Sequence, residues 1–307
     1  MTAESAAMET GKPQRCGFVA LLGAPNAGKS TLLNRLVGAK VSIVTPKAQT
    51  TRTRVLGITV KGETQLVFID TPGVFAPRKR LDRAMVAAAW EGAKSADVVA
   101  LLVDASRPVG DDTRRIVEGL REQGVRAILI LNKIDLIKRE PLLTLADALN
   151  REGIFTDIFM VSALSGDGVG DLIDHLARRL PEGPWLYPED QLSDMPKFLL
   201  AAEVTREQLY LQLQQELPYA AAVETESWTP FEDGSARVDQ IIYVERDSQK
   251  PIVIGKSGAR IKSIGEAARR EMERVFGHKV HLFLHVKVRE WSERAEHYRA
   301  LGLDFEA

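Results

Sequence analysis

The chain has 307 residues, 45% hydrophobic and 27% charged, with a formal net charge of −1 at pH 7. These values are those of an ordinary globular protein with room for two domains, and the net charge alone says nothing about partners. The single cysteine, Cys16, excludes internal disulfides and cysteine-based metal sites, and it favours a reducing compartment. No apolar run is long enough to cross a bilayer. Residues 1–14 lack the hydrophobic core of a signal peptide, so we expect a disordered leader on a cytoplasmic protein.

The first motif in the chain follows an apolar run at residues 18–22. It reads Gly23-Ala24-Pro25-Asn26-Ala27-Gly28-Lys29-Ser30, and an amphipathic segment begins with Thr31. A strand, a glycine-rich turn and a helix form the context of the phosphate-binding loop G-x-x-x-x-G-K-[ST]. Glycine lets the backbone approach phosphate, the loop amides and helix N-terminus attract the anion, and the lysine and serine suit phosphate and Mg²⁺. The motif predicts a nucleotide site; a turn that uses glycine only for its geometry is the alternative.

Charge around this loop is strongly one-sided. Between Thr10 and Gly62 there is no Asp or Glu, whereas nine Lys and Arg residues fall there. Such a segment around a phosphate loop favours polyanions, and a solvated loop face that happens to be basic is the alternative. Within it, residues 39–54 are polar and show no helical periodicity.

Two apolar runs at residues 55–60 and 65–69 predict a pair of strands around a turn at residues 61–63. The second strand ends in Asp70-Thr71-Pro72-Gly73. A carboxylate at the end of a buried strand beside the phosphate loop can hold Mg²⁺ through water, and the glycine N–H can contact a γ-phosphate. Asp-x-x-Gly is common by chance, and only its position after the strand that follows the phosphate loop indicates a role in nucleotide binding.

The rest of the first half alternates helical and buried apolar segments. We expect helices at residues 81–93, 112–123 and 169–180, and strands at 98–103, 127–131 and 154–161. This alternation predicts an α/β domain over residues 15–181, with a mostly parallel sheet covered on both faces. Ligands of such sheets bind at the carboxyl ends of the strands, where the motifs lie.

A guanine-binding element follows the expected strand at 127–131. In Asn132-Lys133-Ile134-Asp135 the aspartate can accept two parallel hydrogen bonds from guanine N1–H and N2–H₂, which adenine cannot supply. The lysine stem can lie along the base. A backbone N–H in Ser162-Ala163-Leu164, after the last strand, can approach guanine O6. These residues predict a guanine nucleotide.

Four prolines between residues 181 and 196 indicate a linker, which we place at residues 182–197. Beyond it we expect an α+β domain at residues 198–289 and a tail at 290–307. The predicted elements of this domain are a helix at 198–216, strands at 220–231 and 237–245, a helix at 264–276 and a strand at 280–288. Trp291 and Tyr298 in the tail either pack against the domain, which we favour, or stack on bases.

Gly255-Lys256-Ser257-Gly258 lies between an apolar turn and a helix that carries Arg260 and Lys262. This stretch resembles the loop of KH domains, which clamps single-stranded nucleic acid through backbone contacts. The order of elements is similar to the type II KH arrangement. Residues 256–289 hold nine Lys and Arg against three Glu, which favours an RNA backbone. His281 and His285 are too far apart on one strand face for easy metal chelation.

The motifs at residues 23–30, 50–51, 70–73, 132–135 and 162–164 together resemble those of the translation-factor-related small GTPases. The forms Pro-Asn-Ala-Gly-Lys-Ser, Gln-Thr-Thr-Arg and Asp-Thr-Pro-Gly-Val narrow the resemblance to the Era-like branch. With the linker and the KH-like domain added, residues 15–295 are similar to the Era family throughout.

This resemblance implies a GTPase that uses GTP, GDP and Mg²⁺. It implies binding of the 3′ end of 16S ribosomal RNA, a single-stranded RNA, through the KH domain and assistance in maturation of the 30S subunit. It implies a cytoplasmic protein with peripheral contacts to the inner membrane, and we expect a monomer. In the family a threonine of the loop at residues 39–54 coordinates Mg²⁺ in the triphosphate state; we choose Thr51, with Thr50 as the alternative. We expect Ser30 and, through water, Asp70 to hold the same ion.

We assign Lys29, Thr51, Gly73 and Asn26 to catalysis. Signalling GTPases carry a water-orienting glutamine where this chain has Val74, so we expect slow intrinsic turnover. In related GTPases the residue corresponding to Asn26 helps to hold K⁺; the alternative is that Asn26 only stabilises the loop.

Two other functions are alternatives. One is a regulatory GTPase switch whose KH-like domain binds a protein or another RNA, and the other is a GTP-dependent RNA-modifying enzyme, for which no second catalytic centre is evident. In the favoured mechanism, GTP and Mg²⁺ order residues 39–54 and 73–80, and this changes how the two domains dock.

Overall fold

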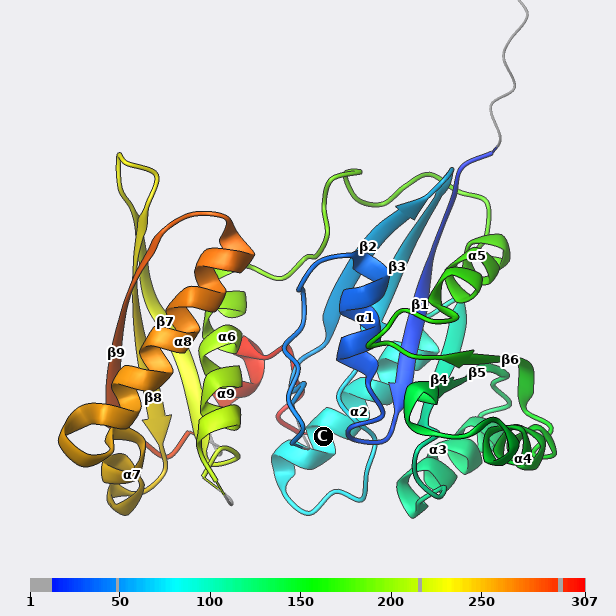
Figure 1. The fold of residues 1–307 in the computed structure, drawn as a ribbon, viewed down its shortest axis with the longest axis horizontal. Helices are drawn as coiled ribbons and strands as arrows, with labels where there is room; N and C mark the ends of the chain where they lie inside the picture. The colour runs from blue at the N-terminus through cyan, green and yellow to red at the C-terminus, as the bar shows by residue number, and fades with distance from the viewer. Residues whose placement is uncertain (1–12, 48–49, 215–216, 292–294, 307) are drawn as a thin grey trace, which may run out of the picture.

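The computed structural model describes residues 13–47, 50–214, 217–291 and 295–306, without the side chains of 296, 297 and 300. The expected leader therefore lies almost wholly outside the described residues, as does Gln49. Two bodies lie side by side, one formed by the first half of the chain and one by the second (Figure 1). The segment that joins them passes over the top of the first body in that view and then descends to the second.

The first domain is built on a six-stranded sheet in the order β2-β3-β1-β4-β5-β6. Its strands are parallel except that β2 pairs antiparallel to β3, as the two adjacent runs predict. The strands are β1 (Arg15–Gly23), β2 (Val55–Lys61), β3 (Thr64–Asp70), β4 (Val98–Asp104), β5 (Ala127–Asn132) and β6 (Phe155–Val161).

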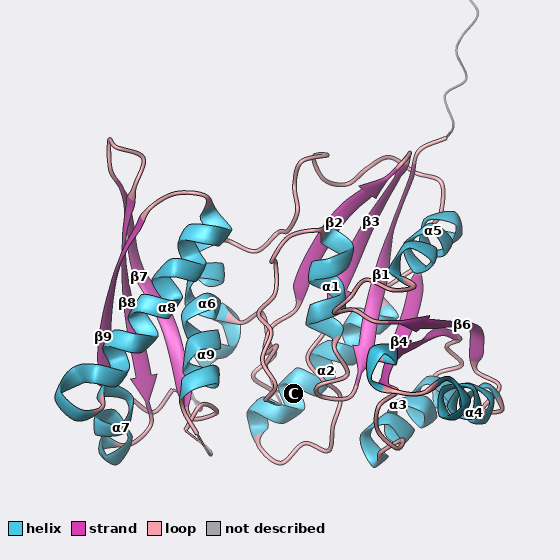
Figure 2. Ribbon diagram, in the orientation of Figure 1, coloured by secondary structure: helices cyan, strands magenta, loops and turns pink. Residues whose placement is uncertain are grey.

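Helices cover both faces of this sheet (Figure 2). They are α1 (Lys29–Val37), α2 (Arg80–Lys94), α3 (Asp111–Glu122), α4 (Arg139–Asn150) and α5 (Val169–Arg179). Val19 and Leu21 of β1 face α1 and α5, whereas Ala20 and Leu22 face the side that carries α2, α3 and α4. The expected α/β fold with a sheet covered on both faces is confirmed. Helix α4 was not expected.

The proline-rich segment is attached to the first domain along its edge strand. Ile58 N donates to Leu192 O at 2.8 Å, and Ser193 Oγ donates to Leu56 O at 2.6 Å. The Gln65 side-chain oxygen accepts from the backbone N–H of Leu186 at 2.9 Å. An extended backbone beside an edge strand finds hydrogen-bond partners without forming a helix. This conformation suits a segment rich in proline, which disfavours helix.

The second domain has the predicted order of helices and strands in a three-stranded sheet, β7-β8-β9. Strand β8 pairs antiparallel to β7 and parallel to β9. Helices α6 and α8 pack on one face of this sheet. The elements are α6 (Lys197–Gln212), β7 (Ala221–Pro230), β8 (Ala236–Val244), α7 (Lys250–Ile254), α8 (Ala259–Phe276), β9 (Val280–Val288) and α9 (Ala295–Ala300).

Three details differ from expectation. Helix α6 ends at Gln212, before the expected end at residue 216, which lies outside the described residues. The apolar turn before the Gly-x-x-Gly stretch is the short helix α7, and α8 begins at Ala259 instead of residue 264. Glycine at 258 adopts φ 78°, a left-handed conformation that lets α8 start at once.

The tail fills the space between the two domains. Trp291, Tyr298 and Leu301 form one buried cluster with Leu81 of α2 and Ile241 of β8. Trp291 is 2% exposed and its Nε1 donates to Ala220 O at 3.0 Å. The favoured packing alternative therefore holds for both tail aromatics. No helix in the described parts of the chain is long and apolar enough to cross a membrane.

Candidate functional site

The phosphate-binding loop joins the carboxyl end of β1 to the start of α1, as predicted. Lys29 is 6% exposed, and its Nζ donates to the carbonyl oxygens of Gly23 (3.0 Å) and Ala24 (3.2 Å). Burial disfavours the ammonium and lowers the pKa of Lys29 to about 8, although the nearby Asp70 carboxylate opposes this shift. A buried cation folded onto its own loop carbonyls is well suited to receive an anionic phosphate.

The structure adds a reason for the two glycines of this loop. A Cβ at Gly23 would lie 2.7 Å from the carbonyl oxygen of Leu102 in β4. A Cβ at Gly28 would overlap the side-chain nitrogen of Asn132, and Gly28 also adopts φ 99°. Contact with the neighbouring strands β4 and β5 thus excludes side chains here, in addition to any approach of phosphate.

Three hydroxyl groups converge on one carboxylate oxygen beside the loop. Asp70 Oδ2 accepts hydrogen bonds from Ser30 Oγ at 2.7 Å and Ser42 Oγ at 3.1 Å. Thr51 Oγ1 lies 3.4 Å from the same oxygen and 2.9 Å from Ser30 Oγ. Asp70 is fully buried, which raises its pKa against the opposing effects of Lys29 and the hydroxyls.

The other carboxylate oxygen, Asp70 Oδ1, is buried and has no hydrogen-bond partner among the described residues. A buried polar atom without a partner is costly and calls for a ligand or water. The donor set of Asp70, Ser30 and Thr51 consists entirely of oxygen atoms, which are the ligands that Mg²⁺ prefers. The residues present therefore fit a hydrated Mg²⁺ ion.

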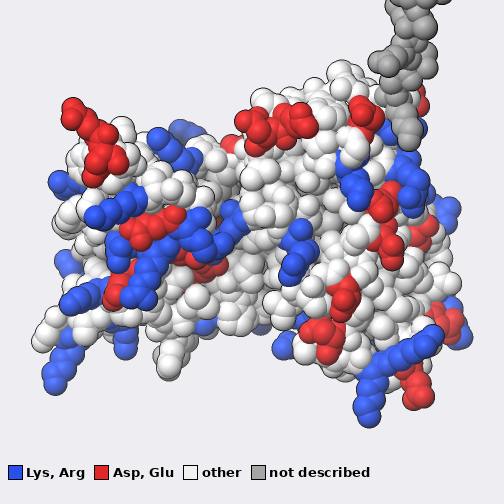
Figure 3. All heavy atoms as spheres, turned by 45° about the horizontal axis from the view of Figure 1, so that its top comes forward, with Lys and Arg blue, Asp and Glu red and all other residues white. Residues whose placement is uncertain are grey.

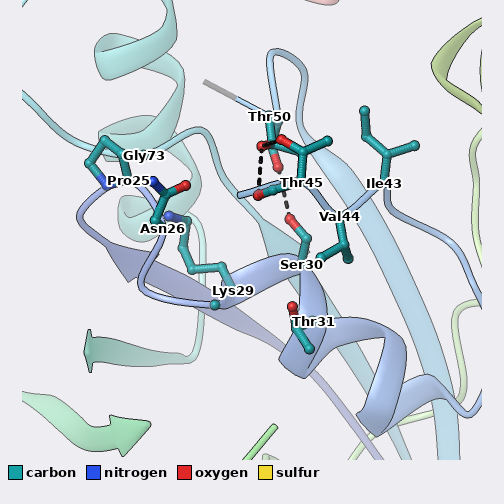
Figure 4. A pocket seen from close by; sticks show the side chains of 12 residues that line it. Pro25, Asn26, Lys29, Ser30, Thr31, Ile43, Val44, Thr45, Thr50 and Gly73 are labelled. Atoms are coloured by element: carbon teal, nitrogen blue, oxygen red, sulfur yellow. Dashed lines mark hydrogen bonds between the residues drawn. The ribbon is translucent and has the colours of Figure 1, made fainter. Parts of the chain in front are cut away.

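The structure separates the two candidate threonines. The Thr50 hydroxyl shares a hydrogen bond of 2.6 Å with Thr45 and donates to Lys47 O at 2.8 Å, away from Asp70. Residues 43–45 and 50–51 face the phosphate loop across an open cavity (Figure 4). Its lining comprises Pro25, Asn26, Gly28, Lys29, Ser30, Thr31, Ile43, Val44, Thr45, Thr50, Thr51 and Gly73.

The stretch that follows β3 contributes unequally to this cavity. Gly73 lines it, and a Cβ there would lie 3.0 Å from the backbone nitrogen of Pro25. Thr71 and Pro72 are buried behind it, and Thr71 Oγ1 donates to Leu21 O at 2.9 Å. Val74 is 3% exposed and belongs to the apolar core under α2 and α3. Val74 therefore presents no polar side-chain atom to water.

Asn132 joins the phosphate loop to the predicted base-binding end. Its Nδ2 donates to Ala27 O at 2.9 Å, and its Oδ1 accepts from Ala163 N at 3.0 Å. Asn132, Ala27 and Ala163 are all buried. The Ala163 N–H is thus already hydrogen-bonded to protein, so it is not the amide available to guanine O6 in this arrangement. Ser162 is buried beside it, and its Oγ accepts from Ser165 N at 3.1 Å.

Lys133 lies over the phosphate loop in a left-handed conformation, φ 67°. Its Nζ donates to Asn26 O at 2.8 Å and forms an ion pair of 2.6 Å with Asp104. Burial opposes ionisation of Asp104, but hydrogen bonds from Lys133 and Ser106 outweigh it and lower its pKa. Asp135 is exposed, as a carboxylate that awaits a base would be.

Several contributing residues were missed by the sequence analysis. Arg35 of α1 donates to Ala163 O at 3.2 Å and to Leu164 O, and so clamps the loop that holds both. Asn34 Oδ1 accepts from the N–H of Ser42 at 3.0 Å and orients the serine that reaches Asp70. The sequence places both residues on the helix that begins at Lys29. It does not indicate their role, because their partners are backbone carbonyls and amides of loops, which any residue type supplies.

The Gly-x-x-Gly stretch of the second domain forms a tight turn between α7 and α8. Gly255 has φ 74° and ψ 173°, and a Cβ there would lie 2.7 Å from Arg260 Cβ. Ser257 and Lys256 are exposed at the tip. Arg260 is held by a hydrogen bond of 2.9 Å to Ile252 O, so part of its donor capacity serves the turn. Lys262 faces a hollow between α8 and β9, which also includes Gly265, Arg269 and Leu284.

Basic side chains gather on the surface of the second domain, interspersed with acidic ones (Figure 3). The three glutamates of α8 each pair with an arginine of the same helix: Glu266 with Arg270, Glu271 with Arg274 and Glu273 with Arg269. Among the described residues, no ion pair forms at Lys256, Arg260 or Lys262. Three cations at the Gly-x-x-Gly turn and the start of α8 therefore keep their charge unpaired, which favours a polyanion there.

The segment at residues 10–62, which contains no Asp or Glu and is called the acid-free segment below, was expected to be either a polyanion surface or a solvated face. Three of its basic side chains instead contact the second domain. Lys40 pairs with Glu207 (2.6 Å) and Glu271 (2.5 Å) of the second domain. Lys47 Nζ donates to Leu213 O, and Arg52 is buried against that domain. The interpretations as a polyanion surface or a solvated face are wrong for these three side chains, which lie between the domains.

Comparisons with known proteins agree with this geometry. A model of the 50S ribosome-binding GTPase family matches residues 18–133, and a KH-domain model matches residues 216–292. GTPase Era of Rhizobium meliloti is 58% identical over 95% of this chain and 94% of its own, and that of Maricaulis maris is 54% identical over 96% and 98%.

Two solved structures match with a TM-score of 0.89, over 94% of this chain and 99% of theirs. One, 39% identical, is Era in complex with MgGDPNP and nucleotides 1506–1542 of 16S ribosomal RNA. The other, 38% identical, is a variant of Aquifex aeolicus Era bound to GDP·AlF4⁻.

The fold and the site define a guanine-nucleotide-binding protein of the P-loop class that carries a C-terminal KH domain. The curated relatives exceed half identity across nearly the whole length of both chains. The chain belongs to the Era family of GTPases.

Proposed function

We propose that this chain binds GTP across the cavity beside α1 and hydrolyses it with Mg²⁺ held by Ser30, Thr51 and, through water, Asp70. Three hydroxyls converge on Asp70, and its Oδ1 has no hydrogen-bond partner among the described residues; this observation supports the assignment. When bound, Mg²⁺ would neutralise charge on the β- and γ-phosphates. Lys29 would exchange its loop carbonyls for phosphate oxygens, and the Gly73 N–H would face the γ-phosphate.

At the base end, Asp135 would accept the two guanine N–H groups while Lys133 covers the ring. Asn132 and Arg35 would act indirectly, because they hold the loop of Ser162, Ala163 and Leu164 next to α1. Val74 orients no water, so intrinsic turnover would be slow. Asn26, exposed beside the cavity, would help to hold K⁺; equal turnover in KCl and NaCl would disprove that role.

We further propose that the KH domain binds the 3′ end of 16S ribosomal RNA and that the protein assists assembly of the 30S subunit. A homologue that matches 94% of this chain is known in complex with that RNA, which supports this assignment. Gly255, Lys256, Ser257 and Gly258 would contact the RNA backbone, and Arg260 and Lys262 would add positive charge. Such work would place the protein in the cytoplasm; binding to anionic vesicles would test the further expectation of peripheral contacts with the inner membrane.

The test is single-turnover GTP hydrolysis with and without a short RNA that carries the 16S 3′ end. Gly258→Asp should remove any effect of the RNA, because it adds a negative charge where phosphate would lie. Gly234→Asp is a matched control, since both glycines have left-handed φ values (78° and 80°) and open space around them, and Gly234 lies in the distant turn between β7 and β8.

RNA that speeds hydrolysis in the wild type and Gly234→Asp, but not in Gly258→Asp, would support one RNA-responsive GTPase. RNA that binds neither the wild type nor the control would refute the RNA assignment and favour a protein partner for the KH domain. Loss of GTP binding in the wild type would refute the nucleotide assignment itself.

A further inference from the structure

The peptide on either side of Thr51 is held by the second domain. Arg206 of α6 donates to the carbonyl oxygen of Thr50. On the other side, Arg52 inserts its guanidinium into the second domain and is 2% exposed. Its acceptors are Tyr219 O at 2.9 Å, Ala221 O at 3.0 Å and the Tyr210 hydroxyl at 3.1 Å. Meanwhile the Thr51 side chain faces its own domain, at Ser30 and Asp70.

Both arginines are buried charges with fixed orientations. Glu203 engages Arg206 through two hydrogen bonds, one of 2.7 Å at Nε. Burial opposes the charge of Arg206, but Glu203 outweighs this effect and raises its pKa. Burial lowers the pKa of Arg52, although arginine stays protonated in proteins. Because buried charges are stable only with their partners in place, these contacts define one position for the loop.

Three further contacts hold the same loop at other positions. Glu207, one position after Arg206 on α6, accepts from Val44 N at 2.8 Å and pairs with Lys40 at 2.6 Å. Thr53 Oγ1 donates to Leu301 O of the tail at 2.6 Å. The second domain and the tail thus contact the loop both before and after the threonine.

We propose that Arg206 and Glu207 of α6 are positioning residues for GTP hydrolysis. They hold residues 40–44 and 50–52 so that the Thr51 hydroxyl reaches Ser30 and Asp70, and the nucleotide site is complete only when the second domain is docked. This inference rests on the proposed function, because it takes Thr51 as a Mg²⁺ ligand. By linkage, a triphosphate that engages Thr51 favours the docked arrangement, and a diphosphate that does not engage it gains nothing from docking.

The experiment compares Arg206→Ala and Arg206→Lys with the wild type. Lys197→Ala is the control on the same helix, because Lys197 lies over Trp228 of its own domain. The first readout is amide hydrogen exchange at residues 44–53 in the nucleotide-free protein. The second is affinity for a non-hydrolysable GTP analogue and for GDP, each as a function of Mg²⁺ concentration.

We expect Arg206→Ala to speed exchange in residues 44–53 and to weaken analogue binding at limiting Mg²⁺ by at least about tenfold, equivalent to roughly 1.4 kcal/mol. GDP affinity should change by less than about twofold, because general destabilisation would weaken both nucleotides alike whereas loss of Thr51 positioning affects only the triphosphate. Arg206→Lys should be intermediate, because one ammonium cannot engage Glu203 twice and Thr50 as well. Lys197→Ala should match the wild type.

Thr51→Ala separates the two levels of the argument. If Thr51→Ala leaves the Mg²⁺ requirement of the analogue unchanged, the metal assignment fails. If Thr51→Ala raises that requirement but Arg206→Ala keeps wild-type exchange and selectivity, only the positioning role fails. If Arg206→Ala does not fold, Arg206→Lys decides: wild-type selectivity between analogue and GDP overturns the inference.

Discussion

Replacing Asn132 with alanine should lower nucleotide affinity far more than its small change in volume suggests. The side chain is 1% exposed, and it pairs a carbonyl of the phosphate loop with an amide of the base-binding loop. Asn132→Ala leaves Ala27 O and Ala163 N buried without these partners. Each orphaned group costs about 1–3 kcal/mol. Water that enters the space left by the side chain would recover part of this, so we expect a net loss of about 2–4 kcal/mol.

Because the proposed site places the two loops at opposite ends of the nucleotide, this loss should appear mainly in binding. An affinity decrease of roughly 30- to 1,000-fold for a fluorescent GDP corresponds to that energy. Asn150→Ala, at the exposed end of α4, is the matched control and should bind normally. If Asn132→Ala binds GDP within about threefold of the wild type, less than roughly 1 kcal/mol, the tie between the loops is not what maintains the site.

Two further predictions concern the boundary between the domains. Trp291→Ala opens a cavity in the cluster shared by α2, β8 and the tail, and it removes the ring that lies 5.1 Å from the Arg52 guanidinium. Urea unfolding should therefore show that the free energy of unfolding falls by about 3–5 kcal/mol. A decrease below about 1 kcal/mol would mean that the tail is not part of a common core. Hydrogen bonds from Arg274 and Lys40 lower the pKa of Glu271 to about 2, below its ordinary 4.5. Its carboxylate therefore stabilises the folded state above pH 4.5, and this contribution fades as the pH falls toward 2. Glu271→Gln should remove about 1–3 kcal/mol at pH 7 and roughly half of that or less at pH 3; an equal loss at both pH values would contradict the ionic origin.

The nucleotide site could be predicted from the sequence because its residues follow the carboxyl ends of parallel strands. Asp70 ends β3 and Asn132 ends β5, and such ends meet at one edge of a sheet. Fully buried strands read as continuous apolar runs, so their ends were easy to locate. Helix α4 was missed even though Leu142, Ala146 and Leu149 recur at helical spacing. Its Pro141 lies in the first turn, where proline is tolerated.

The docking of the domains could not be predicted in this way. Lys40 and Glu271 are 231 positions apart, and neither residue type nor spacing marks them as partners. Arg52 donates to backbone carbonyls, which leave no trace in a sequence. The same holds for Gly28, whose contact with Asn132 depends on how two distant strands pack. Long-range polar contacts of this kind are visible only in three dimensions.

The acid-free segment has a consequence for work on fragments. Its lysines at 40 and 47 and its arginine at 52 obtain their carboxylates and carbonyls from the second half of the chain. A fragment cut within residues 182–197 would expose these cations with no acidic residue nearby in the sequence. We expect such a fragment to adhere to any nucleic acid at low salt and to release it as salt rises. RNA affinity measured on the isolated first domain would then reflect the cations exposed by the cut. That affinity should therefore be measured on the intact chain.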